Sequence, residues 1–122
     1  MAKTMIAVVP SELMAQYFKA KKWRDRDALV YSAIRRAKES DDAVNLGLAA
    51  LQDRAARVRY HACLLLAYSL RKNLLPTMRE RLLTIAELNQ ADLVAAISAI
   101  EHGDHNLFVD RDRSGMITLN VL

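Results

Sequence analysis

Apolar residues recur at helical spacing through most of the chain. Leu13, Met14, Tyr17 and Phe18 fall at positions i, i+1, i+4 and i+5, which places them on one face of a helix. Five later segments show the same periodicity. Their inner positions include Val30, Ala33, Ile34 and Ala37, then Val44, Leu48 and Leu51, then the apolar residues of 56–71, then Met78, Leu82 and Ile85, and last Leu93, Ala96, Ile97 and Ile100. The pattern predicts six helices between residues 11 and 103.

Capping residues indicate where several of these helices begin and end. Ser40 precedes two aspartates, an arrangement typical of a helix start because a serine side chain accepts a backbone N–H there. Thr77 and Glu80 match the S/T-x-x-E capping box, which predicts another start at Thr77. Gly103 predicts the end of the sixth helix, since glycine readily adopts the left-handed conformation that follows a final turn.

The segment 56–71 has the narrowest polar stripe of the six. Arg57, His61, Tyr68 and Lys72 lie along one line of the predicted helix, and most of its other positions are apolar. A helix that is apolar over most of its circumference packs against neighbours on several sides. We therefore predict that this helix is central and that the line of Arg57, His61 and Tyr68 is exposed.

The pattern changes after Gly103. Residues 107–109 and 116–119 are short β-prone runs separated by a polar turn that ends in Gly115, which is typical of a β-hairpin. An isolated hairpin is only marginally stable in water, so it must lie on the helices or gain a strand. Residues 5–9 are a candidate for that additional strand.

Composition agrees with a small helical domain. The 122 residues suffice for one core but not for two, and the chain has only three Gly and two Pro, whereas all-β folds need frequent turns. We predict an all-α fold in a single domain over residues 1–122. It has about six helices in antiparallel pairs over residues 11–103 and a hairpin-like tail over residues 104–122.

Residues 50–62, with the sequence ALQDRAARVRYHA, resemble the turn and second-helix opening of a HEAT repeat. The matching positions are Asp53, Val58, Arg59 and Ala62. The resemblance covers about residues 41–70, and the proline often seen in the first helix of the family is missing. It implies a fragment of an α-solenoid, in which stacked helix pairs hold a protein partner on a concave or end face.

Arg59 is expected to lie on the apolar face of its helix, because it sits about 200° around the helix from Arg57. An unpaired buried charge costs several kcal/mol, so this guanidinium needs a partner. Asp53, just before the helix, is the nearest candidate and can also accept backbone amides at the helix start. We predict a structural Asp53–Arg59 ion pair that fixes the turn between the two helices.

Charge alternates in sign along the chain, with basic segments at 19–38 and 54–81 and acidic segments at 39–53 and 82–122. A basic cluster surrounds the only tryptophan: Lys19, Lys21, Lys22, Trp23, Arg24 and Arg26. Basic side chains bind phosphates and an aromatic ring can stack on a base, so this cluster is a candidate nucleic-acid surface. Asp25 and Asp27 lie inside the cluster and weaken that interpretation.

The start of the tail carries residues that could ligate a transition metal: His102, His105, Asp110 and Asp112. Asp110, Asp112, Ser114 and Gly115 also match part of an EF-hand calcium loop. The position of the bidentate glutamate is Val121 here, however, and two arginines inside the loop repel a cation. A hairpin turn explains the same residues without a metal, so we expect no cofactor.

Enzymatic activity is not expected. Three glycines cannot form a G-x-G-x-x-G or P-loop motif, and Cys63 lies on the apolar side of its helix, where a thiol is inert. One cysteine forms no internal disulfide, which agrees with a reducing compartment, and no apolar run approaches the roughly 18–20 residues that span a bilayer. We expect a cytoplasmic protein without membrane contact.

The leading hypothesis is a non-enzymatic protein–protein interaction module of HEAT-like type. Its expected contact residues are Arg57, His61, Tyr68 and Phe108. An open edge of the C-terminal strand could recruit another chain or form a homodimer. A nucleic-acid-binding protein is the first alternative, and a small metal-binding protein or enzyme using residues 102–112 is the second.

Overall fold

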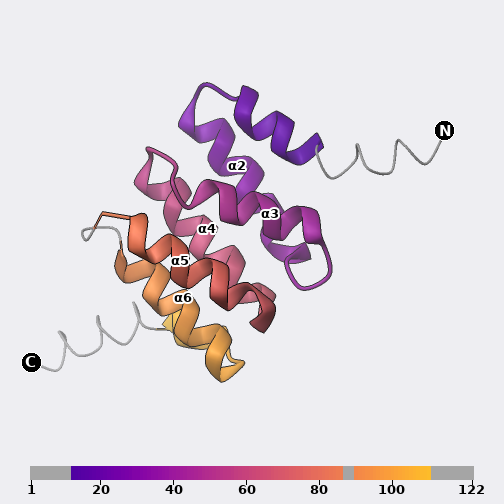
Figure 1. Ribbon diagram of the computed structural model, residues 1–122. Helices are drawn as coiled ribbons and strands as arrows, with labels where there is room; N and C mark the ends of the chain where they lie inside the picture. Colours follow the sequence, from indigo (N-terminus) through magenta and orange to yellow (C-terminus); the bar gives the residue numbers. More distant parts are fainter. Residues whose placement is uncertain (1–11, 87–89, 111–122) are drawn as a thin grey trace, which may run out of the picture.

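The computed structural model describes residues 12–86 and 90–110, and these form helices and connecting turns with no strand among them (Figure 1). A first helix at residues 12–19 is followed by α2 (Trp23–Ala33), the 3₁₀ helix η1 (Ile34–Arg36), α3 (Asp41–Ala50), α4 (Ala56–Ser69), the 3₁₀ helix η2 (Lys72–Leu74), α5 (Leu75–Thr84) and α6 (Gln90–His102), and a last helical segment covers residues 106–110. The prediction of an all-α protein is confirmed for this part of the chain. None of these helices is long and apolar enough to cross a membrane.

Helix α4 occupies the middle of the molecule. It contacts α2, η1, α3 and α6, and Figure 1 shows α2 and α3 on one side of it and α5 and α6 on the other. Val58, Ala62, Leu65 and Leu66 of α4 are completely buried. The central position predicted from its narrow polar stripe is confirmed.

The approach of α3 to α4 depends on Gly47. A Cβ atom added at this position would lie 2.9 Å from Cδ2 of Leu65 and 3.3 Å from Cδ2 of Leu66. Such distances are well inside van der Waals contact, and the tight packing of a protein interior leaves little room to adjust. Glycine therefore allows the backbone of α3 to lie directly against the leucines of α4.

The helix ends follow the predictions in two places and depart from them in a third. Ser40 caps α3, since its Oγ accepts the N–H of Ala43 at 3.1 Å, and Gly103 follows α6 with a left-handed φ of 66°. Helix α5 begins at Leu75 instead of Thr77, and no side-chain cap is present. The predicted capping box is wrong because Pro76 fits the first turn of a helix, where its missing N–H is not needed.

Ser40→Ala is expected to lower the free energy of unfolding by about 1 kcal/mol, because the N–H of Ala43 loses its acceptor. The measurement is urea denaturation followed by circular dichroism. Ser32→Ala is the matched control, since Ser32 is exposed and its hydroxyl donates only to the carbonyl of Leu29 within α2. A change within about 0.5 kcal/mol is expected for the control. Equal losses in both variants would contradict the capping role.

The predicted β-strand at residues 107–109 is wrong, because residues 106–110 are helical. The carboxylate of Asp104 accepts the N–H of Asn106 at 3.0 Å and so starts this short helix. Phe108 is completely buried, with its ring centroid 5.6 Å from that of Tyr60 on α4. The second predicted run at 116–119, the candidate strand at 5–9, and the strand edge proposed for dimer formation lie outside the described residues.

Candidate functional site

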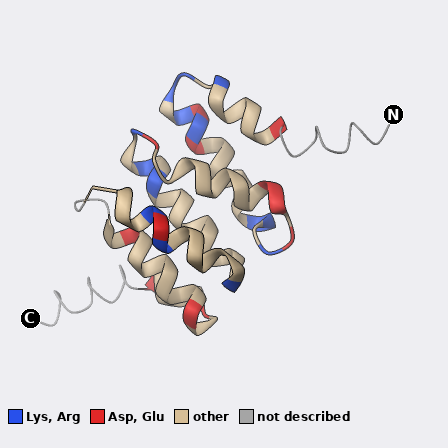
Figure 2. Ribbon diagram, viewed as in Figure 1, with Lys and Arg blue, Asp and Glu red and all other residues tan. Residues whose placement is uncertain are grey.

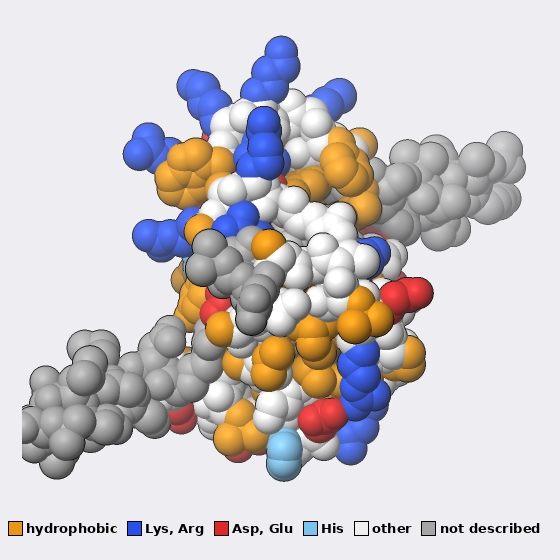
Figure 3. All heavy atoms as spheres, turned by 60° about the vertical axis from the view of Figure 1, so that its left-hand side comes forward, with side chains coloured by type: hydrophobic (Ala, Val, Ile, Leu, Met, Phe, Trp, Pro, Cys, Tyr) orange, Lys and Arg blue, Asp and Glu red, His pale blue; other side chains and the backbone are white. Residues whose placement is uncertain are grey.

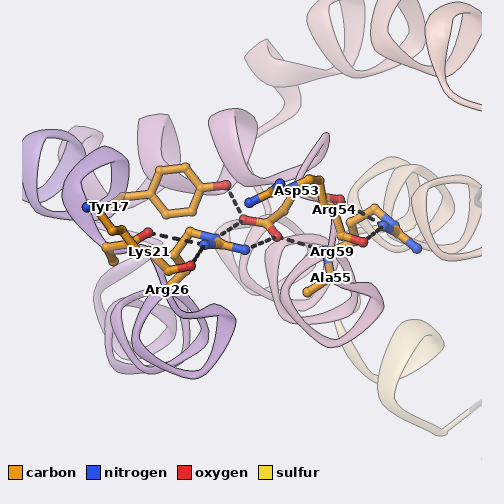
Figure 4. A network of polar contacts seen from close by, with 8 residues as sticks. Tyr17, Lys21, Arg26, Asp53, Arg54, Ala55 and Arg59 are labelled. Carbon is orange, nitrogen blue, oxygen red and sulfur yellow. Dashed lines mark hydrogen bonds and ion pairs between the residues drawn. The ribbon is translucent and has the colours of Figure 1, made fainter.

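Asp53, in the turn between α3 and α4, is the centre of a buried polar network (Figure 4). Its carboxylate accepts hydrogen bonds from Nε and Nη2 of Arg26 at 2.7 and 3.2 Å, and from the hydroxyl of Tyr17 at 2.5 Å. The backbone N–H of Ala55 donates to the same carboxylate at 2.9 Å. The side chain of Asp53 is only 2% exposed. One carboxylate therefore connects the helix at residues 12–19, α2, and the turn that leads into α4.

The predicted Asp53–Arg59 ion pair needs correction. Nη1 of Arg59 donates to the backbone carbonyl oxygens of Asp53 and Arg54, at 2.7 and 2.9 Å, while the carboxylate of Asp53 pairs with Arg26 (Figure 4). Arg59 thus holds the turn as expected, but through main-chain oxygens. The carboxylate is directed toward α2 and the first helix, because those elements cover that side of the turn.

The network shifts the pKa values of all three side chains. Burial is the largest influence on the pKa of Asp53 and raises it, but hydrogen bonds from Arg26, Tyr17 and the Ala55 amide together outweigh burial and hold this pKa below its ordinary value. Burial and the adjacent carboxylate raise the pKa of Tyr17. The hydrogen bond to Asp53 raises the pKa of Arg26 despite burial. At neutral pH the network is therefore an ion pair with a neutral tyrosine donor.

Arg26 also fixes the loop that leads into α2. Its Nη1 donates to the carbonyl oxygens of Ala20 and Lys21 at 3.1 and 3.0 Å. Because Arg26 is buried, it does not belong to the exposed basic cluster in which the sequence placed it. The other members of that cluster are exposed: Lys19, Lys21, Lys22, Trp23 and Arg24.

The exposed basic residues gather at one end of the molecule. Figure 2 shows Lys and Arg around the loop between the first helix and α2, and Figure 3 shows basic side chains projecting from that end. Lys21 and Arg54 line one hollow, together with Phe18 and Gln52. The turn before α4 therefore adds a cation, Arg54, that sequence proximity did not assign to this cluster.

His61 is buried, which corrects its predicted role as an exposed contact residue. Its Nδ1 lies 2.6 Å from Oδ1 of Asp27 on α2. The rings of Tyr31 and Tyr60 meet the imidazole edge to face, with centroids 5.1 and 5.5 Å away. These contacts hold His61 in the interface between α4 and α2.

A shallow groove lies beside His61, between α2–η1 and α4. Its lining residues are Tyr31, Ile34, Arg35, Leu64 and Tyr68. Its volume of about 230 Å³ is below the roughly 300–1,000 Å³ typical of small-molecule sites. The groove thus suits a side chain or two of a protein partner better than a cofactor.

Of the four contact residues predicted from the sequence, only Tyr68 lines this groove. Arg57 is exposed on the same line of α4, whereas His61 and Phe108 are buried. Sequence reasoning missed Tyr31 and Arg35, although their spacing of four residues places them on one face of a helix. This spacing was visible in the segment that forms α2 and η1, but nothing in the sequence indicated that this face lies beside α4.

The predicted metal ligands do not form a cluster in the part of the chain that the structure describes. Nδ1 of His102 lies 2.8 Å from the carbonyl oxygen of Ser98, and the His105 ring stacks on Tyr68 with centroids 4.3 Å apart. Asp110 is exposed at the end of the described residues, and Asp112 lies outside them. Within residues 12–86 and 90–110, no group of three or more His, Cys, Asp or Glu side chains could hold a metal ion.

Comparison with known proteins gives no relative for this chain. No protein-family model matches the sequence, and neither a curated protein nor a solved structure matches it. Over residues 12–86 and 90–110 the chain is a small all-helical protein.

Cys63 is buried in α4 and is therefore a poor candidate for a nucleophile. The side chains of the described residues contain no buried nitrogen or oxygen atom that lacks a hydrogen-bond partner. An unsatisfied buried polar group is one of the usual signs of a ligand or reaction site. The groove beside α4 and the exposed basic residues near α2 are the features that can contact a ligand.

Proposed function

We propose that this chain is a non-enzymatic, HEAT-like protein-interaction module that binds an acidic, partly apolar segment of another protein. The observation that supports the proposal is the groove between α2–η1 and α4. We expect a cytoplasmic setting, as the sequence predicts.

The groove combines an exposed aromatic anchor with positive charge. Tyr31 is 61% exposed and stands at one wall, with Ile34 and Leu64 beside it. Tyrosine and arginine are enriched among the residues that dominate binding energy at protein interfaces. Arg35 lines the groove, so the complementary ligand carries an apolar side chain next to a carboxylate.

The helix pair α3–α4 is compatible with the HEAT-like part of the proposal. These helices lie within the segment that resembles the repeat, pack against each other, and are joined by the turn that contains Asp53. Asp53 and Arg59 both hold this turn, through the carboxylate and the guanidinium respectively. In a stack of helix pairs, such contacts fix the angle between successive helices and so shape the exposed groove.

The proposal is tested by selecting peptides from a displayed random library on the purified protein. Enriched peptides are expected to place Asp or Glu beside a large apolar residue. Arg35→Glu is expected to weaken a selected peptide by about tenfold or more, because a like charge then faces the carboxylate. Fluorescence polarisation with a labelled peptide measures the affinity.

Arg36→Glu is the matched control, because Arg36 is exposed on η1 next to Arg35 but does not line the groove. It makes the same change in charge and is expected to alter the affinity by less than about threefold. Tyr31→Ala is expected to weaken binding by a similar factor to Arg35→Glu. Failure to enrich acidic, apolar peptides, or equal effects of the two arginine substitutions, would refute the proposed binding mode.

A further inference from the structure

A second surface lies at the end of the molecule where the first helix meets α2. We use the name basic corner for Lys19, Lys21, Lys22, Trp23, Arg24 and Arg54, all of which are exposed. Among the described residues, none of its five cations takes part in an ion pair. Their charges are therefore available to an anionic ligand (Figure 3).

Aromatic rings are exposed within the same surface. Trp23 is 41% exposed, and the Arg24 guanidinium lies 5.5 Å from its ring centroid. Phe18 is 69% exposed and lines the hollow that Lys21 and Arg54 share. A surface for unpaired nucleotides has two components: cations that bind phosphates, and flat rings on which bases stack. A nucleotide uses both components, since its phosphate pairs with a cation and its base stacks on a ring.

Buried contacts hold the basic corner in place before any ligand arrives. Arg26 is anchored on Asp53 and donates to the carbonyl oxygens of Ala20 and Lys21 (Figure 4). The N–H groups of Asp25 and Arg26 donate to the carbonyl oxygen of Lys22. A loop fixed in this way loses little conformational freedom on binding, which favours affinity.

The acidic residues near this surface offset only a small part of its charge. Asp27 points to His61 and is partly buried, and Asp53 is covered by Arg26 and Tyr17. Asp25 is exposed, and its carboxylate repels a phosphate chain that passes close to it. Both Asp25 and Asp27 lie within the basic cluster in the sequence, but in the fold Asp27 is directed to His61.

We infer that the basic corner binds single-stranded nucleic acid, with phosphates on its lysines and arginines and a base stacked on Trp23. The bases of the ligand must be unpaired, because the bases of a duplex are already stacked on one another and cannot stack on Trp23. The surface is separate from the groove proposed for a protein partner, so the two sites can be tested independently.

The first experiment uses the only tryptophan of the chain as the reporter. Titration of the full-length protein with a 15-nucleotide oligo(dT) at 50 mM salt is expected to quench the fluorescence of Trp23. If all five cations contact phosphates, the affinity falls by about 100-fold between 50 and 200 mM salt, given a slope of about −0.7 per contact for single strands. A 15-base-pair duplex is expected to bind without comparable quenching.

Charge-reversal variants locate the surface. The triple variant Lys21→Glu, Lys22→Glu, Arg24→Glu is expected to weaken binding of a labelled oligo(dT) by at least about 100-fold. The matched control, Arg36→Glu, Lys38→Glu, Lys72→Glu, changes the net charge equally at exposed positions outside the basic corner and is expected to have an effect below about threefold. Circular dichroism verifies that both variants fold.

Trp23 substitutions test the stacking step. Trp23→Ala is expected to weaken oligo(dT) by about fivefold to 100-fold, whereas Trp23→Phe retains most of the affinity because it keeps an aromatic face. Absence of binding at 50 mM salt, equal losses in the two charge-reversal variants, or equal quenching by the duplex would overturn the inference. Polyglutamate that competes fully with oligo(dT), combined with no effect of Trp23→Ala, would instead assign the surface to acidic proteins.

Discussion

Asp53→Asn is expected to lower the free energy of unfolding by about 3–5 kcal/mol. Removing one partner of a buried ion pair leaves the other charge without compensation, and such losses are among the largest that single substitutions produce. Here the uncompensated group is the guanidinium of Arg26, whose side chain is 10% exposed. The hydroxyl of Tyr17 and the N–H of Ala55 lose a charged acceptor in the same substitution. Urea denaturation at pH 7, followed by circular dichroism, measures the loss.

Glu101→Gln is the control for this prediction. Glu101 pairs with Arg79 across α5 and α6, but the two side chains are 41% and 53% exposed. Exposed pairs contribute roughly 0–1 kcal/mol, so the control is expected to remain within that range. Tyr17→Phe is a milder probe of the network, with an expected loss of about 1.5–3 kcal/mol for a hydrogen bond to a charged group. Equal effects of Asp53→Asn and Glu101→Gln would show that the buried pair does not hold the fold together.

The pH dependence provides an independent check on Asp53. Its pKa in the folded protein lies below the ordinary value. A carboxyl group of this kind stabilises the fold fully above its unfolded pKa, near 4, and the contribution disappears as the pH falls through the lower folded value. The difference in stability between wild type and Asp53→Asn is therefore expected to be constant between about pH 5 and 7 and to shrink below about pH 4. A difference that grows on acidification would contradict the assigned direction.

The positions of the longer helices were predictable because each carries its own apolar stripe, whereas the short helix at residues 106–110 was not predicted. The buried residues Val30, Ala33, Ile34 and Ala37 are the ones that the spacing placed inside. Local chemistry also indicated some helix ends, as at Ser40, where the serine hydroxyl needs only the next few residues to act. Sequence patterns succeed where the decisive contacts are within one turn of the chain.

The partner of Asp53 was not predictable in the same way. Arg59 is six residues away and was favoured by proximity, whereas Arg26 is 27 residues away and reaches Asp53 only after α2 packs on the turn. A long arginine side chain on an apolar helix face can donate its hydrogen bonds to main-chain oxygens instead of to a carboxylate. The sequence pattern does not show which of the two acceptors it will have. The groove between α2–η1 and α4 is subject to the same limit, because its two walls come from segments that meet only in the folded state.

Helix α2 connects the core with both proposed surfaces. Val30 and Ala33 are buried in the core, while Asp27 and Tyr31 contact His61 at the edge of the groove. Arg26 anchors the loop of the basic corner. A substitution that loosens α2 should therefore affect the groove and the basic corner together, which is why the charge-reversal variants are placed at exposed positions only.

Phe108→Ala is expected to lower the free energy of unfolding by about 3–5 kcal/mol, the usual range for removing a large buried aromatic side chain. Phe108 is 0% exposed and its ring lies against Tyr60 of the central helix. The cavity left by the substitution would open next to α4, where close packing restricts collapse. Urea denaturation measures the loss, and the slope of the unfolding free energy against urea should stay unchanged if the core otherwise survives.

Leu107→Ala is the matched control, since Leu107 is the preceding residue and is 44% exposed. In a helix, neighbouring side chains point about 100° apart, so one apolar residue can be buried while the next faces solvent. The control is expected to lose no more than about 1 kcal/mol.

A strand laid on the helices would also bury alternate residues, but it would group Leu107 with Val109 and oppose both to Phe108. In the observed helix Val109 is partly buried, so Val109→Ala should cost more than Leu107→Ala. Equal effects at 107 and 109 would favour the strand over the helix.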